Sequence, residues 1–188
     1  HIAPAWTRGL APETPTFSAI LKQAGYSLDY VGKWHVHQDI DPCGFGFDRH
    51  EMVGGARRDL LPGSAIGVTF QNGTEFTLAA TDACPEEETS IWKRTRRAVA
   101  MMRERAEQDS PFFLRIDVPE PHFPCVPPLP YASMYNPADI PPWGNFPDDL
   151  AGKPQGHRRK RQEWNLEDKT WDWWRDVVAK YYGTVTLV

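Results

Sequence analysis

Two segments of this chain pair a helix with a strand that follows it directly, and this order constrains the fold more than any other feature. Residues 89–108 carry apolar side chains at helical spacing, and the apolar run 111–118 has the length of a buried strand. Residues 16–25 predict a shorter helix capped by Thr16, and residues 26–32 then alternate as a strand does. A helix followed by a buried strand is typical of an α/β fold, in which helices flank a sheet.

The spacing also predicts which faces of these helices are buried. The stripe of the first helix is Phe17, Ile20, Leu21 and Ala24, with Gly25 as a left-handed stop, and the stripe of the second is Ile91, Thr95, Ala98, Val99, Met102 and Ala106. Met101 and Met102 are interpreted as core filling rather than as a ligand site. A last helix follows Thr170, with one face formed by Trp174, Val177, Val178, Tyr181 and Val185.

Glycines and prolines mark the segments between these elements. Residues 43–81 are rich in glycine and predict loops and one small hairpin, with Asn72-Gly73 as its turn. Eleven of the 18 prolines lie between Pro119 and Pro154, too dense for regular structure. We therefore expect a long rigid surface loop or lid over about residues 119–169.

Composition excludes several classes of protein. The 188 residues are 40% hydrophobic and 24% charged, which is ordinary for a globular domain with one core. The net charge of −4, with both signs intermixed, gives no basic surface of the kind that binds nucleic acid. No apolar run reaches the roughly 20 residues of a membrane helix, and the start shows no signal-peptide pattern. Cys43, Cys84 and Cys125 predict neither a disulfide framework nor a Cys-x-x-Cys metal site, so the compartment stays open.

Neither end of the sequence resembles a natural terminus. His1 is no initiator, and the chain stops inside the apolar run 184–188 with no cap or polar tail. We therefore expect residues 1–188 to be the central part of a larger α/β domain that is incomplete at both ends.

Two histidines and a lysine follow predicted strands. Lys33 and His35 come directly after the first strand, and His122 follows the apolar strand 111–118 between Pro121 and Pro124. Ligands of open α/β sheets bind beyond such strand ends, where a lysine can hold an anionic oxygen and a histidine can transfer protons. The alternatives are that Lys33 is solvated, that His35 packs under Trp34, and that His122 is an ordinary turn residue. Lys33 is not a P-loop lysine, because the glycine and the Ser or Thr of that motif are missing.

Four stretches of the sequence resemble the sulfatase family in the same order. The first is Pro15-Thr16-Phe17-x-x-Ile20-Leu21-Lys22-x-Ala24-Gly25-Tyr26-x-Leu28-x-x-Val31-Gly32-Lys33-Trp34-His35, which is similar to the second signature of that family. The others are Gly46-Phe47-Asp48, Pro111-Phe112-Phe113-Leu114 leading to Pro121-His122-Phe123-Pro124, and Tyr181-Tyr182-Gly183-Thr184-Val185.

The resemblance implies an alkaline-phosphatase-like α/β fold and hydrolysis of a sulfate ester by a formylglycine beside a calcium ion. It implies that Lys33 binds the sulfate, that His35 lies beside the second hydroxyl of the nucleophile, and that His122 lies near the leaving oxygen. Cationic donors at these positions suit the charge that moves onto the bridging oxygen as the S–O bond breaks.

The sequence also departs from the family pattern. The nucleophile motif is Cys or Ser, any residue, Pro, any residue, Arg, whereas Cys125-Val126-Pro127-Pro128-Leu129 lacks the arginine and lies after the Gly-Lys-Trp-His segment. The paired aspartates and the Asp-Asn pair of the metal site are missing, and Asp148-Asp149 stands in the wrong place to replace them. We therefore expect calcium ligands and nucleophile to lie outside this chain, and the isolated 188 residues to be inactive.

Three further clusters carry no assigned role. A polar loop contains His35, His37, Asp39, Asp41, Asp48 and His50, but their spacing matches no zinc pattern. Lys153 and the run 158–161 form a basic patch interpreted as a solvated loop, with a second anionic group of a substrate or a partner as the alternatives. Trp164, Trp171, Trp173 and Trp174 cluster nearby. Trp174 is expected in the core, whereas Trp171 and Trp173 face a neighbour, a missing segment or a partner.

Several alternatives stay open at this stage. A phosphate or phosphonate monoester hydrolase of the same superfamily would need the same cationic side chains to bind its substrate. A non-catalytic anion- or glycan-binding relative would retain these side chains but lack the nucleophile. The substrate, whether a sugar sulfate, an aryl sulfate or a sulfamate, depends on loop shape that sequence does not give. Oligomeric state is likewise open.

Overall fold

A computed structural model describes residues 9–52 and 59–188 of the chain. The chain divides into two compact units, which are His1–Ala56 with Glu87–Pro119, and Arg57–Glu86 with Glu120–Val188. Each unit has its own sheet and its own apolar core. Within the described ranges, no helix has the length and apolarity that crossing a membrane would require.

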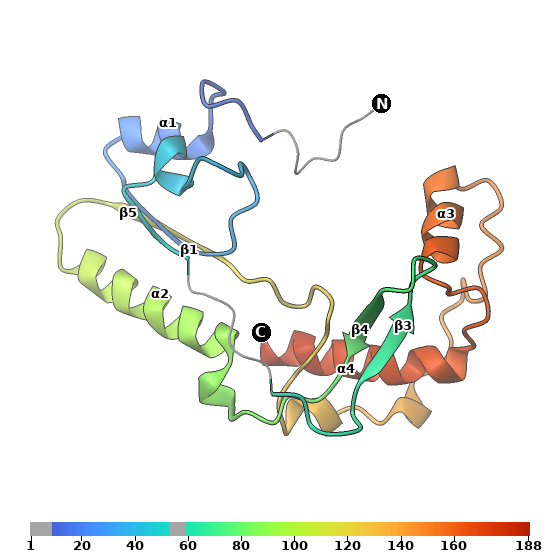
Figure 1. Ribbon diagram of the computed structural model, residues 1–188. Helices are drawn as coiled ribbons and strands as arrows, with labels where there is room; N and C mark the ends of the chain where they lie inside the picture. Colours follow the sequence, from blue (N-terminus) through green and yellow to red (C-terminus); the bar gives the residue numbers. More distant parts are fainter. Residues whose placement is uncertain (1–8, 53–58) are drawn as a thin grey trace. The chain divides into compact units, whose positions relative to one another are not determined.

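The first unit is a parallel three-stranded sheet covered by helices on both faces. Its strands β1 (Ser27–Gly32), β2 (Arg49–Glu51) and β5 (Phe112–Asp117) have the order β2-β1-β5, and both pairings are parallel. Figure 1 shows this sheet between α1 (Phe17–Gln23) and α2 (Ser90–Ala106). The predicted α/β fold is therefore confirmed.

Alternate side chains of β1 enter two different cores. Leu28 and Tyr30 pack with Phe47 on the face covered by α1 and the short 3-10 helix η2 (Pro42–Phe45). Val31 packs with Ala98 and Met101 on the face covered by α2. The strand is thus buried on both faces, as the central strand of a parallel sheet is.

The predicted helices exist, but their buried faces differ from the predicted stripes. Thr16 caps α1, and Gly25 adopts a φ of 87°, as the sequence predicts. Leu21 packs on the core as predicted, whereas Phe17 and Ile20 are largely exposed. The one fully buried side chain of α1 is Ser18, which donates to the carbonyl of Phe45 in η2. In α2 the buried positions are Ile91, Arg94, Ala98 and Met101, whereas Met102 is exposed, so the predicted stripe is displaced by one position at its C-terminal end.

Two features of this sheet differ from the sequence-based expectation. The strand β5 is only half-buried, because β1 is its one neighbour among the described strands and β5 lies at the edge of the sheet. The short strand β2, which lies in the glycine-rich segment, was not predicted. Its three residues carry no apolar alternation that could have indicated it.

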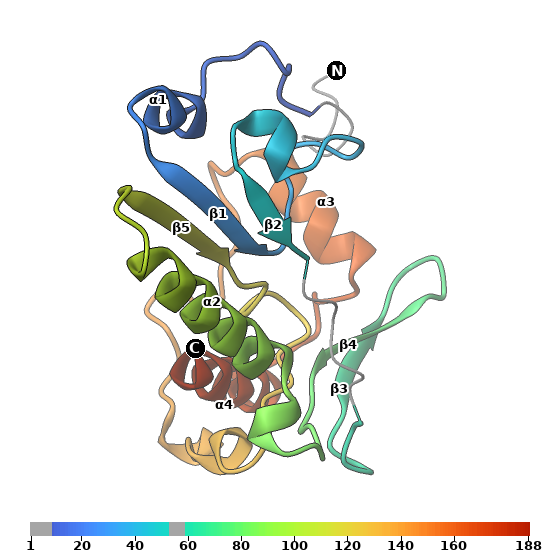
Figure 2. The ribbon, with the colours of Figure 1, turned by 90° about the vertical axis from the view of Figure 1, so that its left-hand side faces the viewer.

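The second unit contains the predicted hairpin and the last helix. The strands β3 (Ile66–Thr69) and β4 (Glu75–Ala79) are antiparallel, and Gly73 has the positive φ of the predicted turn. Figure 2 shows the two strands of this hairpin side by side. The helix α4 (Trp171–Leu187) packs on the hairpin through Val177, which joins Val68, Leu78 and Cys125 in one core. Tyr181 and Val185, predicted on the buried face of α4, are exposed, and Thr170 stands at the cap position without a side-chain cap bond.

The proline-rich segment contains more regular structure than expected. It includes the 3-10 helices η4 (Tyr131–Ser133) and η5 (Pro137–Asp139) and the helix α3 (Gln155–Glu163); a further 3-10 helix, η3 (Glu86–Glu88), precedes α2. The expectation of an irregular loop is wrong for α3, because the proline cluster ends at Pro154, directly before this helix. Ion pairs from Arg159 and Lys160 to Glu163 support the helix.

Candidate functional site

Lys33 and His35 follow the C-terminal end of β1 in the first unit. Lys33 is half-buried and His35 is exposed, so His35 does not pack beneath Trp34. The indole of Trp34 instead donates a hydrogen bond to the carbonyl of Ile40 at 2.8 Å and lies edge-on to Tyr30. Trp34 therefore anchors the turn that separates the two polar side chains.

The backbone before Lys33 is held against the end of β5. Gly32 has a φ of 122°, and a Cβ at this position would lie 2.0 Å from the carbonyl oxygen of Asp117. The backbone N–H of Lys33 donates to the same oxygen at 2.8 Å. Only glycine fits both the conformation and the approach of the two strands.

The hydroxyl of Tyr30 reinforces this contact. Its oxygen lies 2.5 Å from the carbonyl of Lys33 and 2.7 Å from the carboxylate of Asp117, which also accepts from the guanidinium of Arg115. Burial, and then the hydrogen bond to the Asp117 carboxylate, raises the pKa of Tyr30. The phenol therefore stays protonated and remains a donor beside Lys33.

His122 belongs to the second unit and is exposed. Its Nδ1 lies 2.6 Å from the carbonyl oxygen of Phe123, so Nδ1 carries the proton and donates it to that oxygen. This contact fixes the tautomer and leaves Nε2 available to a ligand. Lys33 and His35 share one unit and His122 lies in the other, so the expectation of a single site stays a prediction.

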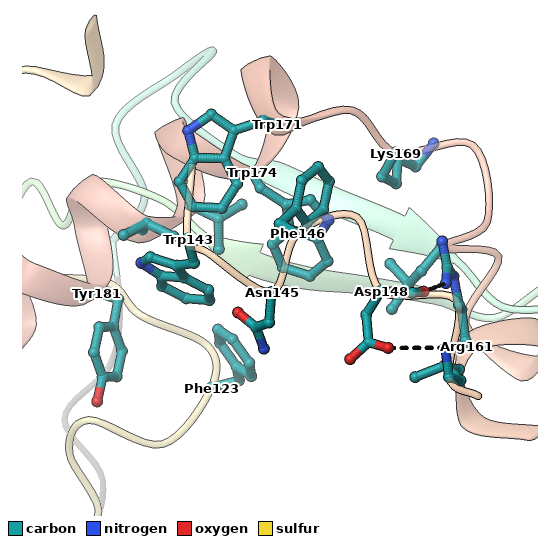
Figure 3. A pocket seen from close by; sticks show the side chains of 14 residues that line it. Phe123, Trp143, Asn145, Phe146, Asp148, Arg161, Lys169, Trp171, Trp174 and Tyr181 are labelled. Carbon is teal, nitrogen blue, oxygen red and sulfur yellow. Dashed lines mark hydrogen bonds between the residues drawn. The ribbon is translucent and has the colours of Figure 1, made fainter. Parts of the chain in front are cut away.

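An aromatic pocket begins at Phe123, the residue after His122. This cavity of the second unit has a volume of about 410 Å³, and Figure 3 shows it from close by. The aromatic side chains that line it are Phe123, Trp143, Phe146, Trp171, Trp174 and Tyr181, and the aliphatic ones are Leu150, Leu166, Val177 and Val178. We call this cavity the aromatic pocket.

Four polar side chains also line the aromatic pocket, namely Asn145, Asp148, Arg161 and Lys169. Arg161 donates to the backbone carbonyl of Asp148 at 2.6 Å (Figure 3). The carboxylate of Asp148 pairs with Lys153. Trp171 is buried, and its indole donates to the carbonyl of Ile140 at 3.0 Å. The expectation that Trp171 faces a neighbour or partner is therefore wrong.

Sequence reasoning missed Trp143 and Phe146 as parts of this pocket. Both lie in the proline-rich segment, and Trp143 and Phe146 each contact Trp171 with ring centroids 5.3 Å apart. No periodic pattern marks such a segment, so only the aromatic residues themselves carried a signal. Four residues of the basic patch are exposed, as predicted, whereas Arg161 is half-buried in the pocket wall. Arg159 and Lys160 pair with Glu163.

The described residues do not fit the calcium ion that the resemblance implies. Calcium takes six to eight oxygen ligands. Across residues 9–52 and 59–188, the one group of three potential ligands within mutual reach is Asp41, Cys43 and His50, which offers a single carboxylate. We therefore assign no metal ligand of the family to this chain and derive no step through calcium.

The cysteines give no candidate for the formylglycine either. Cys125 is fully buried, and its Sγ lies 3.6 Å from the carbonyl of Pro121. Neither Cys43 nor Cys84 has Pro two residues later or Arg four residues later, as the nucleophile motif requires.

Comparison with known proteins identifies the family. The family profile described as Sulfatase matches residues 2–188. The chain is 30% identical over 162 residues to the "Uncharacterized sulfatase YidJ" of Escherichia coli (strain K12), which covers 81% of this chain and 32% of YidJ. An "Uncharacterized protein" of Haemophilus influenzae is 34% identical over 61 residues, covering 32% of this chain and 31% of that protein.

A solved structure shares the fold. This is BT4656 in complex with its substrate D-glucosamine-2-N,6-O-disulfate, with a TM-score of 0.58 and 17% identity, over 97% of this chain and 45% of that chain. The likeness confirms the predicted alkaline-phosphatase-like α/β fold. The chain spans about a third of the length of YidJ and less than half of BT4656. Because the family profile matches nearly every residue, the chain belongs to the sulfatase family.

Proposed function

We propose that the protein containing this chain hydrolyses a sulfate ester, and that Lys33, His35 and His122 bind and protonate the reacting group. Membership of the sulfatase family supports this activity in general terms. The observation that supports the role of Lys33 is the contact of Gly32 with Asp117, which holds Lys33 at the C-terminal end of a parallel strand. Ligands of open α/β sheets bind at such ends.

Lys33 supplies a fixed positive charge for a sulfate oxygen. The backbone of Lys33 is hydrogen-bonded to Asp117 and Tyr30, so the backbone that carries the ammonium group is already ordered. Less conformational entropy is therefore lost when the ammonium group binds an anion. His35 follows two residues later and is exposed, so its imidazole is accessible to the same ligand. The pair therefore offers an ammonium group and an imidazole to one ligand.

His122 supplies the proton for the leaving oxygen. Its Nδ1–H is bonded to the carbonyl of Phe123, so a protonated ring donates to a ligand through Nε2. A proton on the bridging oxygen neutralises the charge that develops as the S–O bond breaks. His122 thus belongs on the side of the sulfate from which the leaving group departs.

The aromatic pocket supports an apolar ring as the leaving group. Phe123, which follows His122 in the sequence, lines it, and its walls are mainly aromatic and aliphatic. A sugar ring would bring several hydroxyls that need polar partners, whereas an aryl ring needs none. We therefore favour an aryl sulfate over the sugar sulfate that BT4656 takes.

Two other functions remain as alternatives. A phosphate or phosphonate monoester hydrolase would use the same cationic groups, and a non-catalytic relative would bind the anion without turning it over. Turnover of 2-naphthyl sulfate and 2-naphthyl phosphate by the whole protein separates the three. Faster turnover of the sulfate supports the proposal, faster turnover of the phosphate supports the first alternative, and binding without turnover of either supports the second.

A further inference from the structure

We propose that Asp41, Cys43 and His50 form a binding site for one divalent cation of the zinc class. Asp41 and Cys43 lie at the start of η2, and His50 lies in β2, all within the first unit. The fold brings a carboxylate, a thiol and an imidazole together with their ligand atoms within 4.8 Å of one another. The three ligands do not include Lys33, His35 or His122.

The distance between two of the ligand atoms already matches a bound zinc ion. The Sγ of Cys43 lies 3.4 Å from the Nδ1 of His50. Zinc bonds of about 2.3 Å to sulfur and about 2.0 Å to nitrogen, at a tetrahedral angle, place these atoms about 3.5 Å apart. The carboxylate of Asp41 would complete the site by moving no more than about 1.5 Å, given tetrahedral edges of about 3.5 Å.

The backbone around the three residues is ordered by contacts that a metal would not disturb. The Oδ1 of Asp41 accepts from the N–H groups of Cys43 and Gly44 at 2.9 and 3.2 Å, so a metal bonded to Oδ2 leaves both bonds intact. His50 is paired with Tyr30 of the central strand. Two ligands therefore come from one capped turn and the third from a sheet, which reduces the loss of entropy on binding.

The ligand types favour zinc over the hard cations. Calcium and magnesium take oxygen ligands, whereas a thiolate and an imidazole suit zinc. Three protein ligands leave a fourth tetrahedral position for water, and Asp41 and Cys43 are exposed, so an ion can enter from solvent. The spacing of two and seven residues matches no common zinc motif, so only the fold indicates the site.

Cobalt spectroscopy tests the site without reference to sulfatase activity. The whole protein, saturated with Ca²⁺, is titrated with Co²⁺ and then with Zn²⁺. We expect one equivalent of Co²⁺ to give a thiolate-to-cobalt charge-transfer band that one equivalent of Zn²⁺ removes. Cys43→Ser should abolish the band, while Asp41→Asn, which keeps the backbone cap, and His50→Ala should each weaken Co²⁺ binding at least tenfold.

Cys84→Ser and His37→Ala are the matched controls and should leave the band and the affinity unchanged. Circular dichroism of each variant checks that the fold is retained. The proposal is overturned if no charge-transfer band forms, if the band survives Cys43→Ser in a folded protein, or if the controls reduce it equally. Binding that produces no thiolate band would mean an adventitious ion only, and would also overturn it.

Discussion

Gly32 lies against the backbone of Asp117, so that a Cβ on Gly32 would come within 2.0 Å of the Asp117 carbonyl oxygen. The same oxygen accepts the N–H of Lys33. The ends of β1 and β5 are thus joined where the first candidate site residue begins, and the position of Lys33 depends on a glycine that bears no functional group.

Replacing Gly32 with alanine should therefore disrupt both the fold of the first unit and the activity. The clash is with backbone atoms, which cannot rotate away, and φ is positive at this residue. We expect Gly32→Ala to lower the free energy of unfolding by more than about 3 kcal/mol in urea, well above the usual range for a glycine at positive φ alone. The control is Gly25→Ala, where φ is 87° but no atom lies within 4 Å of the added Cβ. Equal losses in the two variants would show that the contact with Asp117 does not matter.

Asp29 makes the first unit sensitive to acid. The buried carboxylate accepts two hydrogen bonds each from Arg49 and Arg105. Burial alone would raise the pKa of Asp29, but the bonds from Arg105 and Arg49 outweigh it and hold the pKa below its ordinary value of 3.8. A lowered pKa means that the stabilisation is present above pH 3.8 and is lost as the pH falls through the lowered value.

Asp29→Asn should cost about 3–5 kcal/mol of unfolding free energy at pH 7, because two arginines lose a buried partner. The difference from the natural protein should shrink as the pH falls below 3.8, since the natural carboxylate is then protonated as well. Urea unfolding from pH 2 to pH 7 measures this difference in unfolding free energy. The control is Glu104→Gln, because Glu104 is an exposed partner of the same Arg49. A difference that stays constant with pH would contradict the role of the charge.

Replacing Trp143 with alanine should lower the turnover of bulky aryl substrates and leave that of small ones unchanged. Trp143 is half exposed at the edge of the aromatic pocket, so its removal leaves the core intact. We expect Trp143→Ala to lower kcat/KM for 2-naphthyl sulfate about five- to tenfold, since one aromatic contact is worth about 1 kcal/mol, and to leave methyl sulfate unchanged. Trp92→Ala, on α2 in the other unit, is the control. Binding of 2-naphthol, followed by tryptophan fluorescence, tests the pocket even in a protein without turnover.

The sequence predicts local structure well where one rule decides it. Thr16 and Gly25 bound α1 as their capping preferences require, and Asn72-Gly73 turns the hairpin. Burial is predicted less well, because it depends on partners far along the chain. Met101 rather than Met102 faces the sheet, and Ile20 of α1 is exposed.

For the candidate sites too, the sequence predicts individual residues but not the long-range contacts that hold them. Lys33, His35 and His122 could be selected from their positions after strands, and the contact that holds Lys33 could not, because Asp117 lies 85 residues after Gly32. Trp143 and Phe146 reach Trp171 through an irregular segment, and His50 reaches Cys43 through a strand of three residues. These contacts are set by tertiary structure, which periodicity does not encode.

Sulfatase turnover of Lys33→Ala and His122→Ala in the whole protein tests the central claim most directly. The controls are Lys22→Ala, an exposed lysine paired with Asp48, and His157→Ala, an exposed histidine on α3. We predict that kcat/KM for 2-naphthyl sulfate falls about 100- to 1000-fold in each test variant, as for other groups that stabilise developing charge, while thermal unfolding and both controls stay near the natural protein. Near-normal turnover in folded Lys33→Ala or His122→Ala would contradict the account.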